Sequence, residues 1–231
     1  MICVLFPVIL ALARIGGVFL SRQPSCDSRV VVFLDYQNVY MGARETFGSR
    51  RTPSRFGQVD PLALGQLIVA RHPDPTRLHE VRVYRGRPDP QRDPRAYAAN
   101  MRQSRAQENR GGGVVTVISR PLRYPKEWPR LPAEEKGIDV SLAADLVAMA
   151  ATERFDVAVV MSTDTDLLPA LEAAAIFAGR PYARFELAGW REPGQSHRRL
   201  VPKGRRLWCH WLDRDDFEAV RDDTDYNVGR P

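Results

Sequence analysis

Two short apolar runs, each followed at once by polar residues, set the pattern of this chain. Residues 157–161 (VAVVM) lead into Ser-Thr-Asp-Thr-Asp at 162–166, and residues 30–34 (VVVFL) lead into Asp-Tyr-Gln-Asn at 35–38. Continuous apolar runs of this length are typical of strands that helices cover on both faces of a parallel sheet. The polar residues therefore fall where two strands end, which is the edge of an open α/β sheet at which ligands bind.

Apolar runs and helical periodicity alternate along the rest of the chain. We expect further strands at residues 81–84, 114–118, 182–187 and 207–212, and helices at residues 38–47, 61–70, 91–109, from 139 onward, 167–178 and 213–220. The helix at 91–109 is expected to be exposed. The alternation predicts an α/β fold of three layers, α/β/α, with a mainly parallel central sheet.

The 231 residues are enough for one domain that buries its core without disulfides or structural metals. We place that domain at residues 29–222, after an apolar N-terminal extension and linker at 1–28. An acidic tail follows at 223–231. The carboxylates of this tail, together with the neighbouring Asp222, are expected to fray.

Acidic residues at three places are candidates for one site. Asp35 and Asp164 follow the two apolar strands, with Asp166 two residues further on. Asp139 falls at the start of the helix that leads into the strand at 157–161. On a regular helix Asp145 lies about 120° around from Asp139, which makes Asp145 the weaker candidate. Ser, Thr and Asp at a helix start also serve as N-caps, so capping is the alternative interpretation.

Three ordered motifs carry a family resemblance. They are a strand ending D-x-x-N (Asp35 and Asn38), the segment K-G-x-D-x-x-L-x-x-D-L (136–146) and a strand ending S-T-D-x-D-L-x-P (162–169). In this order and at these separations, they resemble the NYN domain group of the PIN-like nucleases. The resemblance covers residues 29–187. It implies a PIN-like fold and a metal-dependent ribonuclease.

Hydrolysis of a phosphodiester needs an activated water and neutralisation of the leaving oxygen, and divalent ions provide both without histidine or cysteine. Hard ions such as Mg²⁺ or Mn²⁺ prefer oxygen ligands. We expect Asn38 and Ser162 to orient water or hold the acids, and Lys136 to balance charge or contact phosphate. The expected metal ligands, which are also the expected catalytic acids, are Asp35, Asp139, Asp164 and Asp166.

The chain is basic, with a formal charge of +6, and only three of its 34 basic residues are lysine. A basic protein with an acid cluster suggests a polyanion held near metal ions. The resemblance to a ribonuclease family implies that this partner is RNA, single-stranded or structured. Arg85 and Arg87 end a predicted strand at the same edge as the acids, where they can meet phosphate. Segment 197–206 places five positive charges in ten residues. It is either a solvated loop or a substrate clamp made by Arg198, Arg199, Arg205 and Arg206.

Several other functional classes lack their signatures. No glycine-rich fingerprint follows a strand, which argues against a nucleotide cofactor. Cys3, Cys26 and Cys209 are too scattered for a disulfide framework or a zinc site. The four histidines do not pair at ligand spacing, and none is assigned to catalysis. A phosphatase of the haloacid dehalogenase type ranks last, because Asp35-Tyr36-Gln37 lacks the second acid of that D-x-D motif.

A non-catalytic RNA-binding or regulatory module with the same fold is the competing interpretation. The resembled motifs keep all of their acids, and this favours the enzyme. A homo-oligomer is possible, and the sequence does not specify the RNA target.

Residues 1–20 form a long apolar run that Pro7 and Arg14 interrupt. The run approaches the length of a membrane span, whereas the basic start of a secretory signal is missing. Three interpretations stay open, namely an extension from a misplaced start, a membrane anchor and a secretory signal. The nuclease-like core favours the first. We therefore expect a cytoplasmic protein, with membrane contact only if this segment is native and acts as an anchor.

Overall fold

The computed structural model describes residues 28–49, 51–177, 184–195, 199–201 and 207–228. Within them, six strands form one sheet in the order β3-β2-β1-β4-β5-β6, and all neighbours are parallel. The strands are β1 (Ser28–Asp35), β2 (Thr76–Arg87), β3 (Val115–Pro121), β4 (Val157–Met161), β5 (Arg184–Trp190) and β6 (Cys209–Leu212). The prediction of an α/β fold around a mainly parallel sheet is confirmed.

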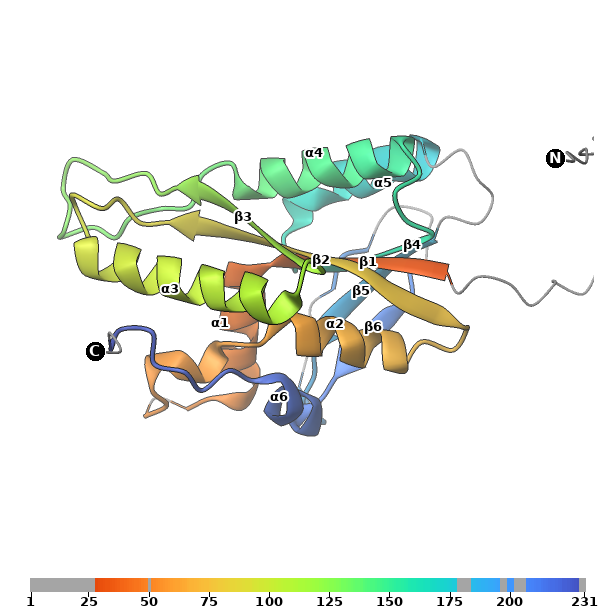
Figure 1. Cartoon of the computed structure of the whole chain (residues 1–231), viewed down its shortest axis with the longest axis horizontal. Helices are drawn as coiled ribbons and strands as arrows, with labels where there is room; N and C mark the ends of the chain where they lie inside the picture. The colour runs from red at the N-terminus through yellow and green to blue at the C-terminus, as the bar shows by residue number, and fades with distance from the viewer. Residues whose placement is uncertain (1–27, 50, 178–183, 196–198, 202–206, 229–231) are drawn as a thin grey trace, which may run out of the picture.

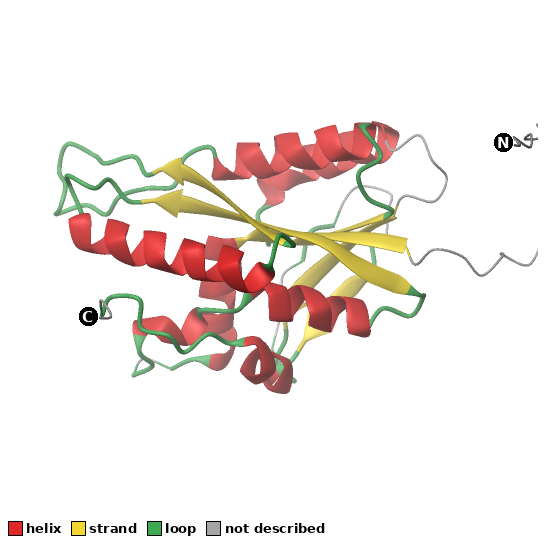
Figure 2. Ribbon diagram, viewed as in Figure 1, coloured by secondary structure: helices red, strands yellow, loops and turns green. Residues whose placement is uncertain are grey.

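Helices cover both faces of the sheet and complete the three layers (Figures 1 and 2). One face carries α4 (Ile138–Ala151) and α5 (Leu168–Phe177), and the other carries α1 (Tyr36–Phe47), α2 (Pro61–Ala70), α3 (Pro94–Gly111) and α6 (Arg214–Val220). Alternate residues of β1 enter two apolar cores. Val30 and Val32 pack with α1 and α2, whereas Val31 and Phe33 pack with α4 and α5. Burial on both faces explains why the strand is apolar at every position.

The order of the strands reverses between β1 and β4, which lie side by side in the middle of the sheet. Leu34 of β1 pairs with Met161 of β4, so Asp35 and Ser162 lie at the same edge. From β1 the chain builds outward through β2 and β3, and from β4 it builds the opposite way through β5 and β6. In open α/β sheets, ligands bind in the crevice outside the carboxyl ends at such a reversal. The fold therefore brings the acids that follow β1 and β4 to a binding position.

Local signals in the sequence determine where two of the helices begin. Asp60 accepts a 2.9 Å hydrogen bond from the backbone N–H of Leu62, and Pro61 occupies the first position of α2. Asp213 and Asp216 form a reciprocal capping box at the start of α6. Both predicted helix starts are confirmed.

Two predictions about the surface are wrong. Asp222 and Tyr226 were expected in a fraying region, yet both are buried, and the Tyr226 hydroxyl donates a 2.6 Å hydrogen bond to Asp222. Arg102 of α3 donates through Nε to the Tyr226 carbonyl oxygen at 2.8 Å, which fastens this segment to the domain.

Helix α3 was expected to be exposed, but it buries Gln103 and Gln107. Its buried face is polar and therefore leaves no hydrophobic pattern.

None of the helices in the described ranges is long and apolar enough to cross a membrane. The apolar residues 1–20, for which a membrane anchor was one interpretation, lie outside those ranges. The expected cytoplasmic location stays a prediction.

Candidate metal centre

Three carboxylates meet at the reversal of the strand order. Asp139, Asp164 and Asp166 each offer one carboxylate oxygen, and the three oxygens lie within 4.8 Å of one another. Asp139 and Asp164 are half-buried, whereas Asp166 is exposed. Two segments that are far apart in the sequence thus place hard oxygen donors around a common point, as binding of a divalent cation requires.

Two local conformations hold these three acids in place. Asp164 caps the 3₁₀ turn η2 (Thr165–Leu167), and its side chain accepts a 3.0 Å hydrogen bond from the backbone N–H of Asp166. On the other segment, Gly137 adopts φ 74° at the N-cap of α4, a left-handed conformation that favours glycine. Asp139 follows in the first turn of that helix. Capping and cluster formation are therefore compatible roles for Asp164.

Asp35 lies beside this group and is buried, with 7% of its surface exposed. Its Oδ2 accepts hydrogen bonds from Asn38 Nδ2 at 2.6 Å and from Ser162 Oγ at 2.9 Å. Its Oδ1 accepts from the Asn38 backbone N–H at 3.2 Å, which makes Asp35 the N-cap of α1. The Thr163 hydroxyl extends this network by donating to Asn38 Oδ1 at 2.7 Å. Asp35 joins β1 to the turn after β4 and is not one of the three grouped carboxylates.

Burial raises the pKa of Asp35, and the nearby charge of Asp164 raises it further, while hydrogen bonds from Asn38 and Ser162 oppose the rise. The net effect is a pKa above the ordinary value for aspartate. Carboxylates that are crowded together in a poorly hydrated site repel one another in their charged forms. A bound divalent cation removes this repulsion, so the electrostatics of the site favour occupancy by a cation.

Glu135 is a further acid at the site, which sequence reasoning missed. Its Oε1 accepts a 2.7 Å hydrogen bond from the backbone N–H of Gly86 at the end of β2. Burial is the main cause that raises the pKa of Glu135, and the charges of Asp35 and Asp139 add to it. Its place directly before Lys136 was the available signal. Thr163 was missed as well, because only the fold brings its hydroxyl to Asn38.

Asp145, the weaker candidate, makes contacts of a different kind. Its Oδ2 accepts hydrogen bonds from Arg82 Nη2 at 2.7 Å and from the Tyr84 hydroxyl at 2.8 Å. It is not part of the group formed by Asp139 and its neighbours. These partners give Asp145 a structural role between α4 and β2.

The basic residues proposed for substrate binding lie in different settings. Arg85 packs its guanidinium 4.7 Å from the centre of the Tyr36 ring and donates through Nη2 to Gln103 at 2.8 Å. Its Nε and Nη1 are buried without a hydrogen-bond partner among the described residues. Arg87 is half-buried, and Lys136 is exposed next to Gly137. Arg199 is exposed, whereas Arg198, Arg205 and Arg206 lie outside the described residues.

Comparison with known proteins identifies the domain. The model of the family described as NYN domain matches residues 29–180, well over half of the chain. The chain belongs to the NYN domain family. The match begins at the residue where the domain was expected to start, and it contains all of the predicted acids together with Glu135.

The NYN domain family is one of the PIN-like nuclease families, so the predicted family is confirmed. No match was found among curated proteins. Among solved structures, this NYN protein is similar to a protein of unknown function from Vibrio parahaemolyticus. The two share 17% sequence identity, with 73% of this chain and 85% of that chain covered, at a TM-score of 0.43.

Proposed function

We propose that this protein is a ribonuclease that depends on a divalent metal ion. The observation that carries the proposal is the group formed by Asp139, Asp164 and Asp166 at the carboxyl edge of a NYN domain. All of its donors are hard carboxylate oxygens, which suit Mg²⁺ or Mn²⁺ better than softer metals. Burial is the main cause that raises the pKa values of the adjacent Asp35 and Glu135, and the charges of neighbouring acids add to it. A bound cation offsets that contribution of the neighbouring charges.

The side chains around the group have distinct tasks in this proposal. When bound, the ion lowers the pKa of water and neutralises charge on the scissile phosphate. Asp139, Asp164 and Asp166 hold the ion. Asp35 is fixed by Asn38 and Ser162 at the rim of the site, where its carboxylate is placed to orient the attacking water.

RNA as substrate is supported by charge. The protein carries a net charge of +6 although its site is acidic, so basic residues elsewhere on the chain attract a polyanion that the metal centre then engages. Lys136 is exposed three residues before Asp139, close enough along the chain to contact a phosphate at the site. Arg87 at the end of β2 is at the same edge of the sheet.

Incubation of the purified protein with end-labelled single-stranded RNA tests the proposal. We expect cleavage with Mn²⁺ or Mg²⁺ and none with EDTA, and restoration of cleavage when excess Mn²⁺ is added back. A single-stranded DNA of the same sequence measures the preference for RNA. Binding of the RNA without cleavage under any metal condition supports the non-catalytic RNA-binding module instead.

A further inference from the structure

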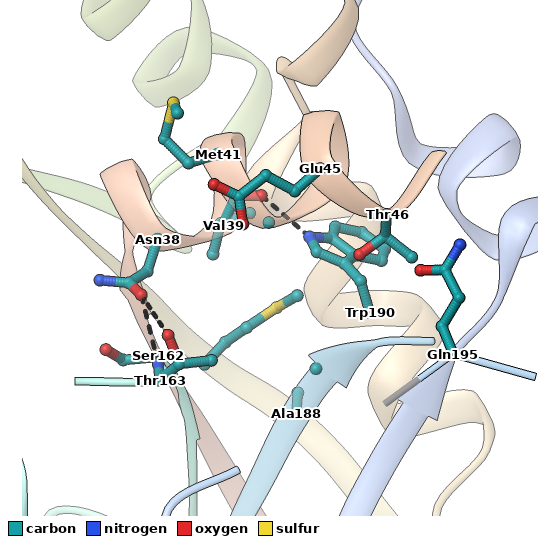
Figure 3. A pocket seen from close by; sticks show the side chains of 13 residues that line it. Asn38, Val39, Met41, Glu45, Thr46, Ser162, Thr163, Ala188, Trp190 and Gln195 are labelled. Atoms are coloured by element: carbon teal, nitrogen blue, oxygen red, sulfur yellow. Dashed lines mark hydrogen bonds between the residues drawn. The ribbon is translucent and has the colours of Figure 1, made fainter. Parts of the chain in front are cut away.

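A cavity of about 510 Å³ adjoins the metal centre on the β4–β5 side of α1. Its volume is within the range of small-molecule binding pockets. Figure 3 shows that α1 forms one wall, while the ends of β4 and β5 form the floor. Asn38, Ser162 and Thr163 line this cavity, and the Ser162 hydroxyl contacts both Asp35 and the backbone N–H of Asp164, so the cavity adjoins the edge of the metal centre.

The middle of the cavity is lined by apolar groups. Met161, Ala188 and Trp190 contribute side chains from β4 and β5. The indole N–H of Trp190 already donates to the Val39 carbonyl oxygen at 2.9 Å, so the ring offers no free donor to a ligand. A Cβ atom at Gly42 would lie 3.1 Å from Cδ1 of Trp190, so glycine at this position lets the indole pack closely against α1. The cavity therefore suits a ligand with flat apolar faces.

Polar groups occur at the two ends of the cavity. Asn38 and Thr163 are at the end next to the metal centre, and Thr46 and Gln195 are at the other, with Trp190 between them (Figure 3). Glu45 of α1 is the one charged residue among the described residues that line the cavity. Its carboxylate is exposed, and no hydrogen bond or ion pair engages it within the described residues. A free acceptor is thus available to a ligand that carries N–H donors.

We propose that this cavity binds the nucleobase of a nucleotide next to the scissile phosphate, with Glu45 selecting guanine. The inference rests on the proposed ribonuclease function. Among the described residues that line it, the cavity has one carboxylate and no cationic residue, which disfavours a phosphate, whereas a base offers flat faces and a hydrogen-bonding edge. Glu45 is seven residues beyond Asn38, about 10 Å along the helix, a span comparable to that from a phosphate to the far edge of its base.

The hydrogen-bonding groups on the edge of the base that faces Glu45 indicate guanine. A carboxylate has two acceptor oxygens and no donor, and guanine presents two adjacent N–H donors, at N1 and N2. Replacement by glutamine converts one of these acceptors into a donor. A glutamine side chain matches the donor and acceptor of adenine, as in its bidentate contacts to that base in DNA. Glu45→Gln should therefore shift the preferred base from guanine towards adenine.

The test uses RNA oligonucleotides of uridine with a single central guanosine, adenosine or cytidine. Wild-type protein should cleave at the guanosine in preference, and Glu45→Gln should lower the ratio of guanosine to adenosine cleavage by about tenfold. Glu172→Gln, which alters an exposed glutamate on the opposite face of the sheet, is the matched control and should keep the wild-type ratio. A base preference that Glu45→Gln leaves unchanged overturns the inference.

A binding measurement separates this inference from the proposed function. In ¹H–¹⁵N spectra, the Trp190 indole resonance, assigned with Trp190→Phe, should shift saturably with guanosine and less with cytidine. The guanosine shift should be lost in Glu45→Gln. Failure of all metal-dependent cleavage contradicts the ribonuclease, whereas absence of any guanosine-dependent shift in wild-type protein contradicts the base site, whatever the cleavage result.

Discussion

Ser162 and Asp35 are 127 residues apart in sequence, and a 2.9 Å hydrogen bond from Ser162 Oγ to Asp35 Oδ2 joins the ends of β4 and β1. The same hydroxyl oxygen accepts a 3.1 Å hydrogen bond from the backbone N–H of Asp164. One buried serine thus connects the rim carboxylate to one of the three grouped acids.

Ser162→Ala should lower both the stability of the fold and metal-dependent cleavage. The change leaves a buried Asp35 oxygen and the Asp164 N–H each without one partner, a loss of about 1–3 kcal/mol in the free energy of unfolding. Urea denaturation and cleavage rates measure the two effects. Ser104→Ala is the matched control, because the Ser104 hydroxyl is buried with no hydrogen-bond partner among the described residues, and its removal should cost far less. Equal effects of the two changes would contradict the role given to Ser162.

Asp145→Asn should lower the free energy of unfolding without changing the cleavage rate. Asp145 pairs with Arg82 and Tyr84 rather than with the grouped acids, so the change weakens an ion pair and a hydrogen bond between α4 and β2. Because the Asp145 carboxylate is partly open to solvent, we expect a loss of only about 1 kcal/mol in the free energy of unfolding. Cleavage per folded molecule should stay at the wild-type value. A loss of metal affinity in Asp145→Asn would instead place this residue in the metal centre.

Glu186 should make the stability of the fold depend on pH. Its buried carboxylate bridges His72 Nε2 at 3.1 Å and His210 Nε2 at 2.8 Å. Burial acts to raise the pKa of Glu186, but the hydrogen bonds and charges of His210 and His72 outweigh it, and the pKa is below its ordinary value of 4.5. A lowered pKa means that the charged form stabilises the fold above the ordinary pKa, and that this contribution disappears as the pH falls below it.

The expected result is a difference between wild type and Glu186→Gln that varies with pH. At neutral pH the variant should have the lower free energy of unfolding, and the gap should narrow as the pH is lowered through about 4.5 and below. Urea denaturation across that range measures the gap. A gap that is constant with pH would show that the charge of Glu186 contributes nothing to stability.

If the basic segment 197–206 clamps RNA, it should increase the affinity for RNA and contribute little to the cleavage step. Replacing Arg198, Arg199, Arg205 and Arg206 with glutamine should weaken RNA binding across all sequences. Each lost phosphate contact should reduce the slope of log affinity against log salt by about 0.7. Cleavage at saturating RNA should change much less. The control is a quadruple glutamine variant of arginines that are exposed elsewhere on the surface, namely Arg51, Arg55, Arg105 and Arg154. Equal slopes of log affinity against log salt for the two variants would support the alternative interpretation, in which the segment is a solvated loop.

The sequence predicted the centre of the fold because burial there is complete. Strands β1 and β4 are covered on both faces, so their apolar runs are unbroken and the following acids mark where each strand ends. Helix α2 was predicted with its observed bounds because Asp60 and Pro61 mark its start. These signals are local and strong, and they also place Asp35 and Asp164 at the same edge of the sheet.

Features that depend on contacts between distant residues were not predictable in this way. Helix α3 buries polar residues such as Gln103, so its inner face leaves no hydrophobic pattern. Glu135 directly precedes Lys136 in the sequence, but the contact of its carboxylate with the backbone of Gly86, and its closeness to Asp35 and Asp139, depend on the fold. The docking of Tyr226 likewise depends on Arg102 and Arg110, more than one hundred residues away in the chain.

Cleavage of single-stranded RNA by Asp164→Asn, compared with wild type and Asp145→Asn in the same Mn²⁺ buffer, tests the central claim most directly. Asp164 belongs to the group of three carboxylates and Asp145 does not, although both are half-buried aspartates of the same domain. With all three proteins shown to be folded, Asp164→Asn should lose at least about a hundredfold in cleavage rate, and Asp145→Asn should keep the wild-type rate. Full cleavage by Asp164→Asn would contradict a metal-dependent nuclease centre at this edge of the sheet.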